Sequence, residues 1–206
     1  SLASTLIEAG VELVSTGNTY KRLRNSKIKT KRVEEVTNFP EILNGRVKTL
    51  HPNVFGGILA DINNKKHINQ ITKLSISKIQ LLVVNLYPFE ETIRQTTSID
   101  ACIEKIDIGG PSLIRAAAKN YLSTAVIVDV KDYKKVIMDI KEYNGISVEL
   151  RKELAIKAFK RTMEYDTSIF RWYEKNLDSK NNKSFFLSGS KIQSLRLKLI
   201  YSAEIM

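Results

Sequence analysis

Residues 79–84 read Ile-Gln-Leu-Leu-Val-Val and give the clearest strand signal in the sequence. Such an apolar run is typical of a strand in the middle of a parallel sheet. Residues 125–128, Ala-Val-Ile-Val, predict a second strand that follows a helix. Because strands and helices alternate along the chain, we expect an α/β fold with a mainly parallel sheet.

The remaining segments complete this alternation. We expect helices at residues 1–9, 20–24, 65–74, 98–105, 113–121 and 132–143, and one long helix or a pair of helices at 148–176. We expect short strands at 11–14 and 31–36, a helical turn at 39–43, and a buried strand or turn at 54–60. The last helix should bury a stripe made of Leu150, Leu154, Ala158, Phe159, Met163 and Ile169.

The composition narrows the class of protein. With 206 residues, 43% of them hydrophobic, the chain is long enough for one domain with a proper core. Its net charge of +11 is spread without a basic block, so we assign it to solvated helix faces and expect no nucleic-acid partner. One cysteine, Cys102, and two histidines, His51 and His67, exclude a disulfide framework and are too few for a zinc site. No apolar run approaches the roughly 18 residues that span a bilayer, so we expect a cytoplasmic protein without a membrane partner.

Residues 45–52, Gly-Arg-Val-Lys-Thr-Leu-His-Pro, predict a rigid loop between a glycine and a proline. Arg46, Lys48 and Thr49 place two cations and a hydroxyl within four residues. This combination suits a phosphate or a developing oxyanion. A solvated basic loop is the alternative interpretation.

Three further groups are candidates for the same site. Residues 15–19, Ser-Thr-Gly-Asn-Thr, lead from a strand into a helix and can aim N–H groups at an anion, although a simple strand–helix connection is the alternative. Asn85 and Tyr87 follow the strand at 79–84, at the end where open α/β sheets bind ligands. Asp107 and Lys119 are candidates for proton transfer. The alternative interpretation of Asp107 is a carboxylate stabilised by a helix N-terminus, and that of Lys119 is an ordinary basic helix face.

Four blocks of sequence carry a resemblance to a known family. VELVSTGNT at 11–19, GRVKTLHP at 45–52, VVNLYPFEET at 83–92 and IDIGGPSLIRAAAKN at 106–120 resemble the IMP cyclohydrolase domain of the bifunctional purine biosynthesis proteins. These proteins couple AICAR transformylase to IMP cyclohydrolase. The resemblance covers residues 1–176 and implies a methylglyoxal-synthase-like fold, with three layers and a central, mainly parallel sheet. Residues 177–206 are then a linker and an irregular tail, a remnant of the start of the transformylase domain.

The resemblance also implies a reaction, the dehydrative ring closure of FAICAR to IMP. This step needs no metal or cofactor, since folate belongs to the transformylase domain. By position, Lys48 and Tyr87 would polarise the formyl oxygen, Asp107 would take or orient the amide proton, and Lys119 would act as a general acid–base. The substrate-binding residues would be Ser15, Thr16, Gly17, Asn18, Thr19, Arg46, Val47, Thr49, Asn85, Ile108, Gly109 and Gly110.

The chain departs from the family pattern in three places. The family begins with a strand and a phosphate-side loop that precede residue 1, so we expect the first strand of the sheet to be missing. The family's second turn glycine is replaced by Asn18, a residue that tolerates positive φ. The third departure is the transformylase domain, which we expect to be absent from this chain. An inactive fragment, or a nucleotide- or phosphometabolite-binding module of the same fold, is therefore the alternative function, and a homodimer is expected from the family.

Overall fold

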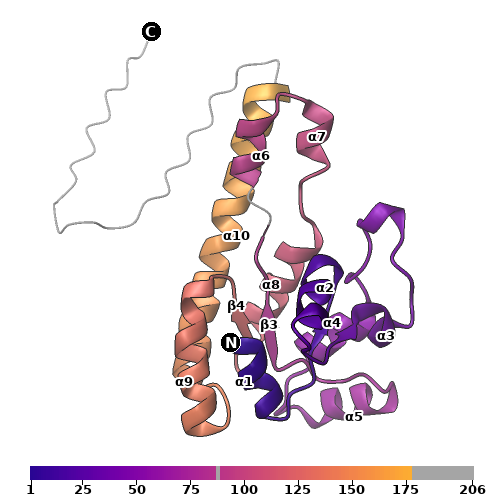
Figure 1. Cartoon of the computed structure of the whole chain (residues 1–206), viewed down its shortest axis with the longest axis vertical. Coiled ribbons are helices and arrows are strands. Elements are labelled where there is room, and N and C mark those ends of the chain that lie inside the picture. Colours follow the sequence, from indigo (N-terminus) through magenta and orange to yellow (C-terminus); the bar gives the residue numbers. More distant parts are fainter. Residues whose placement is uncertain (87–88, 178–206) are drawn as a thin grey trace, which may run out of the picture.

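The computed structural model describes residues 1–86 and 89–177 and contains two pairs of parallel strands. β1 (Val14–Ser15) pairs with β2 (Lys31–Arg32), and β3 (Leu81–Val83) pairs with β4 (Ala125–Ile127). Figure 1 shows one pair, β3 and β4, among the helices. The described helices are α1 (Leu2–Glu8), α2 (Gly17–Asn25), α3 (Val33–Thr37), η1 (Leu43–Gly45), α4 (Pro52–Leu59), α5 (Lys65–Lys73), α6 (Phe89–Gln95), α7 (Ile99–Ile103), α8 (Gly109–Lys119), η2 (Val130–Asp132), α9 (Tyr133–Tyr143) and α10 (Val148–Leu177).

The predicted α/β class with parallel strands is confirmed. The single central sheet appears instead as two separate pairs, since no backbone hydrogen bonds join β1–β2 to β3–β4 within the described residues. Leu177, predicted as the first residue of the linker, is instead the last residue of α10. The rest of the predicted linker and tail, from residue 178 onwards, lies outside the described residues. None of the described helices is long and apolar enough to cross a membrane.

β4 lies at the centre of the core because its side chains alternate between two apolar clusters. Val126 packs with residues of α4, α8 and α10, whereas Ile127 packs with residues of α1, α9 and the start of α10. Both side chains are fully buried. This alternation follows from the two-residue period of a strand, and it places helices on both faces of β4. The predicted three-layer arrangement is thus present around this strand.

α10 is the longest described helix, and it packs against α8, β4 and α6 (Figure 1). Leu154, Ala158 and Tyr165 lie on its buried stripe with at most 1% exposure. The prediction that Phe159 and Met163 belong to this stripe is wrong, because they are 43% and 48% exposed. Since successive helical residues turn by about 100°, the residue after Ala158 already points away from the core.

The segment at 31–36, predicted as a strand, is mostly helical. Only Lys31 and Arg32 pair with β1, and α3 follows at once. The N–H of Arg32 donates to Glu35 Oε1 over 2.6 Å, which satisfies a donor at the helix start.

The segment at 54–60, predicted as a strand or turn, belongs to α4. Pro52 occupies the first turn, and His51 Nδ1 accepts the N–H of Asn53 over 3.1 Å. A proline in the first turn and a side-chain cap are typical of a helix start. Gly57 is compatible with a turn, but its missing side chain serves packing here, because a methyl group would overlap the Ser77 carbonyl.

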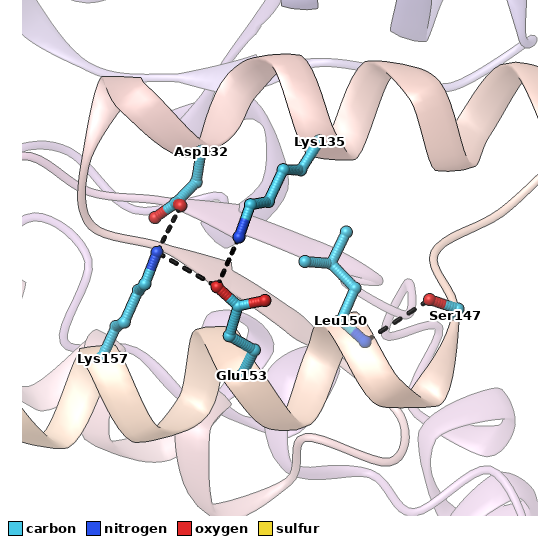
Figure 2. A network of polar contacts seen from close by, with 6 residues as sticks. All are labelled: Asp132, Lys135, Ser147, Leu150, Glu153 and Lys157. Carbon is cyan, nitrogen blue, oxygen red and sulfur yellow. Dashed lines mark hydrogen bonds and ion pairs between the residues drawn. The ribbon is translucent and has the colours of Figure 1, made fainter.

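A network of charges fixes the start of α9 to α10 (Figure 2). The Asp132 side chain is only 4% exposed, and its Oδ1 accepts from Lys157 Nζ over 2.5 Å. Glu153 Oε1 lies 2.7 Å from Lys135 Nζ and 3.3 Å from Lys157 Nζ. Hydrogen bonds to Asp132 raise the pKa of Lys157, and hydrogen bonds from Lys135 and Lys157 lower the pKa of Glu153. These four residues lie away from the predicted site and stabilise the helix pair.

Candidate active site

A large, open cleft of about 2270 Å³ runs past β1 and β3. Residues 9–19, which include β1, form one wall, and residues 75–85, which include β3, form another. Most of the predicted site residues line this cleft: Ser15, Thr16, Gly17, Asn18, Thr19, Arg46, Lys48, Thr49, Asn85, Asp107, Ile108, Gly109 and Gly110. Several of them follow the carboxyl ends of parallel strands, where ligands bind in open α/β sheets.

The basic loop begins as a tight hairpin. Ile42 and Val47 form an antiparallel bridge, in which the Ile42 N–H donates to the Val47 carbonyl over 3.1 Å and the return bond measures 3.4 Å. The turn between them is left-handed at Leu43, Asn44 and Gly45, with φ of 54°, 54° and 91°. This geometry agrees with the predicted rigid loop. Val47, predicted to contact substrate, holds the bridge and does not line the cleft.

Lys48 reaches from this hairpin to the start of α2. A methyl group added at Gly17 would lie 3.9 Å from Lys48 Nζ. Thr16 precedes the helix without a side-chain cap, and the first turn carries no acidic residue. An ammonium group beside uncapped N–H groups at a helix N-terminus is suited to a phosphate. Gly17 is left-handed at φ 50°, whereas Asn18 is not, so the turn needs only one glycine.

Asp107 lies at the start of α8. Its Oδ1 accepts the N–H of Gly110 over 2.9 Å, so the predicted alternative of a carboxylate at a helix N-terminus is observed. A methyl group at Gly109 would lie 3.1 Å from Thr49 Oγ1 and 3.9 Å from Asp107 Oδ1. The hydroxyl of the basic loop and the carboxylate therefore approach the same glycine. A methyl group at Gly110 would overlap Asp107 Oδ2, so glycine is needed for this close approach.

Tyr165 of α10 supports Asp107 from the core. The Asp107 N–H donates to the Tyr165 hydroxyl oxygen over 2.8 Å. Tyr165 is fully buried, and burial raises its pKa. Sequence reasoning gave this tyrosine no role in the site. One sequence signal could have indicated such a role. Tyr165 lies on the predicted buried stripe of a helix, and a buried tyrosine hydroxyl needs a hydrogen-bond partner elsewhere in the fold.

One of the four predicted catalytic residues, Lys119, lies apart from the cleft that Lys48 and Asp107 line. Tyr87 lies outside the described residues. Lys119 is exposed at the last residue of α8, about 15 Å along the helix axis from Gly109, and it does not line the cleft. The roles of Tyr87 and Lys119 stay predictions.

Both cations of the basic loop contact carboxylates that the sequence analysis did not include in the site. Lys48 Nζ lies 2.6 Å from Glu41 Oε2, and Arg46 pairs with Glu104. Hydrogen bonding from Arg46 lowers the pKa of Glu104, and the same contact raises the pKa of Arg46. Both carboxylates line the cleft. No cluster of His, Cys, Asp and Glu suited to a metal ion occurs in the part of the chain that the structure describes.

The structure is an α/β domain with a cleft beside its parallel strands, and this cleft is lined by Arg46, Lys48 and Asp107. Residues 1–112 match the MGS-like domain, and residues 117–197 match the AICARFT/IMPCHase bienzyme. The chain belongs to the family of MGS-like domains, and the resemblance to the bifunctional purine biosynthesis proteins is confirmed.

Curated relatives and a solved structure support this assignment. The chain is 48% identical over 173 residues to the bifunctional purine biosynthesis protein PurH of Mycobacterium ulcerans (strain Agy99), covering 84% of this chain and 33% of that protein. It is 47% identical over 197 residues to PurH of Bradyrhizobium diazoefficiens, covering 94% of this chain and 37% of that protein. A crystal structure of ForH superimposes with a TM-score of 0.72 at 32% identity, covering 84% of this chain and 90% of that chain. The chain thus spans about a third of the length of these curated relatives.

Proposed function

We propose that this chain acts in purine biosynthesis as an IMP cyclohydrolase that closes the ring of FAICAR to give IMP. The similarity to PurH proteins and the AICARFT/IMPCHase match support the proposal. The observation that carries it is the arrangement of the cleft. Lys48 lies beside the start of α2, while Asp107 and Thr49 approach Gly109 on the α8 side.

Ring closure needs control of charge rather than a strong nucleophile. The carboxamide nitrogen forms a bond to the formyl carbon, and the formyl oxygen leaves as water with one proton from each of the two reacting nitrogens. Negative charge develops on that oxygen, where the Lys48 ammonium would stabilise it. Asp107 would accept the carboxamide proton, and the start of α2 would hold the ribotide phosphate. The oxidation states do not change overall, so the proposed step uses no redox cofactor.

Cyclisation of synthetic FAICAR to IMP, followed by chromatography, tests the proposal. We expect Lys48→Ala and Asp107→Asn each to slow the reaction by about 10²- to 10³-fold, because each removes a group that acts on charge in the transition state. Lys135→Ala is the control, since it removes a cation outside the cleft. The proposal fails if FAICAR cyclises no faster with the protein than in buffer.

The exposed position of Lys119 favours a second candidate, a nucleotide-binding module without catalysis. Both candidates bind IMP in the cleft, but only the enzyme turns FAICAR over. Measuring IMP binding and cyclisation on the same preparation separates them. The homodimer implied by the family stays a prediction.

A further inference from the structure

We propose that Glu41 is an internal counter-ion of Lys48 that competes with anionic ligands and so sets the affinity of the cleft for them. The inference rests on the proposed function for its ligand, a phosphate-bearing nucleotide. It goes beyond that function by assigning a role to a carboxylate that neither binds nor reacts with the substrate.

The hairpin places Glu41 opposite Lys48. Ile42 and Val47 form the hydrogen-bonded bridge, and Glu41 and Lys48 are the next positions outward. Side chains at such neighbouring positions come close together across two antiparallel segments. A methyl group at Gly45 would lie 2.6 Å from Glu41 Oε1, so the carboxylate also lies across the turn. The backbone of the hairpin therefore positions this ion pair.

The Lys48–Glu41 pair is more buried than the Arg46–Glu104 pair, so its charges should have the larger effect on ligand affinity. The Lys48 side chain is 20% exposed and that of Glu41 is 40% exposed, whereas Arg46 and Glu104 are 64% and 51% exposed. Charges that are less exposed to water are screened less. An anionic group that approaches Lys48 meets the negative charge of Glu41 at 2.6 Å from the ammonium nitrogen. Its binding must therefore displace Glu41 or overcome repulsion from it.

The test compares anion binding by the wild-type chain and by Glu41→Gln, which removes the charge and keeps the shape. Calorimetric titrations with inorganic phosphate and with IMP give the dissociation constants. Glu153→Gln is the matched control, because it removes one negative charge from an ion-pair network outside the cleft. We expect Glu41→Gln to bind both ligands about fivefold more tightly than the wild type and the control.

A Lys48→Met background provides the second arm. There, Glu41→Gln should change the affinity no more than Glu153→Gln does, because the cation for which Glu41 competes is gone. Glu41→Ala, assayed beside Glu41→Gln, repeats the loss of charge with a different shape.

The outcomes separate this inference from the proposed function. If the wild type binds IMP and the Glu41 variants bind it equally or more weakly, the counter-ion role is refuted while the proposed function stands. Weaker binding would show that Glu41 holds Lys48 in place for the ligand. If no form of the protein binds phosphate or IMP, both proposals fail.

Discussion

Removal of the Tyr165 hydroxyl, by Tyr165→Phe, is expected to weaken both the fold and the site. The hydroxyl is fully buried and accepts the Asp107 N–H over 2.8 Å. Phenylalanine keeps the ring, which packs edge-on against Phe89 at 6.4 Å between centroids. The change therefore isolates one hydrogen bond between the core and the cleft.

The magnitude follows from the surroundings of that bond. A buried donor that loses its acceptor costs about 1–3 kcal/mol, and an ordinary hydrogen bond contributes about 0.5–1.5 kcal/mol. Because the Asp107 end of the bond is only partly buried, water can replace some of the loss. We expect the free energy of unfolding to fall by about 1–2 kcal/mol.

Urea denaturation at neutral pH measures this change. The fluorescence of Trp172 reports on unfolding, since it is the single tryptophan and is buried in α10. Tyr143→Phe is the control, because Tyr143 is 61% exposed at the end of α9. IMP affinity provides a second readout and should fall for Tyr165→Phe alone, because Asp107 loses its support. Equal unfolding free energies for the two variants would refute the assigned role.

Two further predictions concern the start of α8 and the charges of α10. Gly110→Ala should destabilise the chain by about 1–3 kcal/mol and weaken IMP binding, because the added methyl group overlaps Asp107 Oδ2. Gly145→Ala is the control in the denaturation assay, because the methyl group there meets nothing closer than 3.9 Å. The pKa of Glu153 lies below its usual 4.5, so its stabilising contribution is present above about pH 4.5 and is lost as the pH falls through the lowered pKa. Denaturation across pH 3–7 should therefore show that Glu153→Gln is less stable than the wild type by about 0.2–1 kcal/mol at neutral pH and equally stable in acid. A difference in stability that persists in acid would contradict the role of Glu153 in this ion-pair network.

The features of the fold that depend on side-chain period were predictable from the sequence. The apolar runs at β3 and β4 predicted strands because both runs pack into the core, and the stripe of Leu154 and Ala158 predicted α10. The α4 segment was misread because Gly57 has two possible uses. It permits a turn, and it also permits a helix to pack closely, and only the tertiary contact with Ser77 decides between them.

The candidate site was predictable where it is contiguous in sequence. Arg46, Lys48 and Thr49 lie within four residues of one loop. Their combined preference for an anion could therefore be inferred from the sequence alone. Tyr165 and Glu104 were missed because each acts on a residue 58 positions away. No local period encodes such a pairing, which exists only once the chain has folded. Glu41 was within reach, since its place opposite Lys48 follows from the turn between them.

Titration of IMP into the wild-type chain, Lys48→Ala and Asp107→Asn examines whether the basic loop and the start of α8 serve one ligand. Each variant removes a charged hydrogen-bonding group, which is worth about 1.5–3 kcal/mol. We expect the wild type to bind IMP and each variant to bind it about 10- to 100-fold more weakly. Equal affinity in all three proteins, or no binding by the wild type, would contradict a nucleotide site built from these two elements.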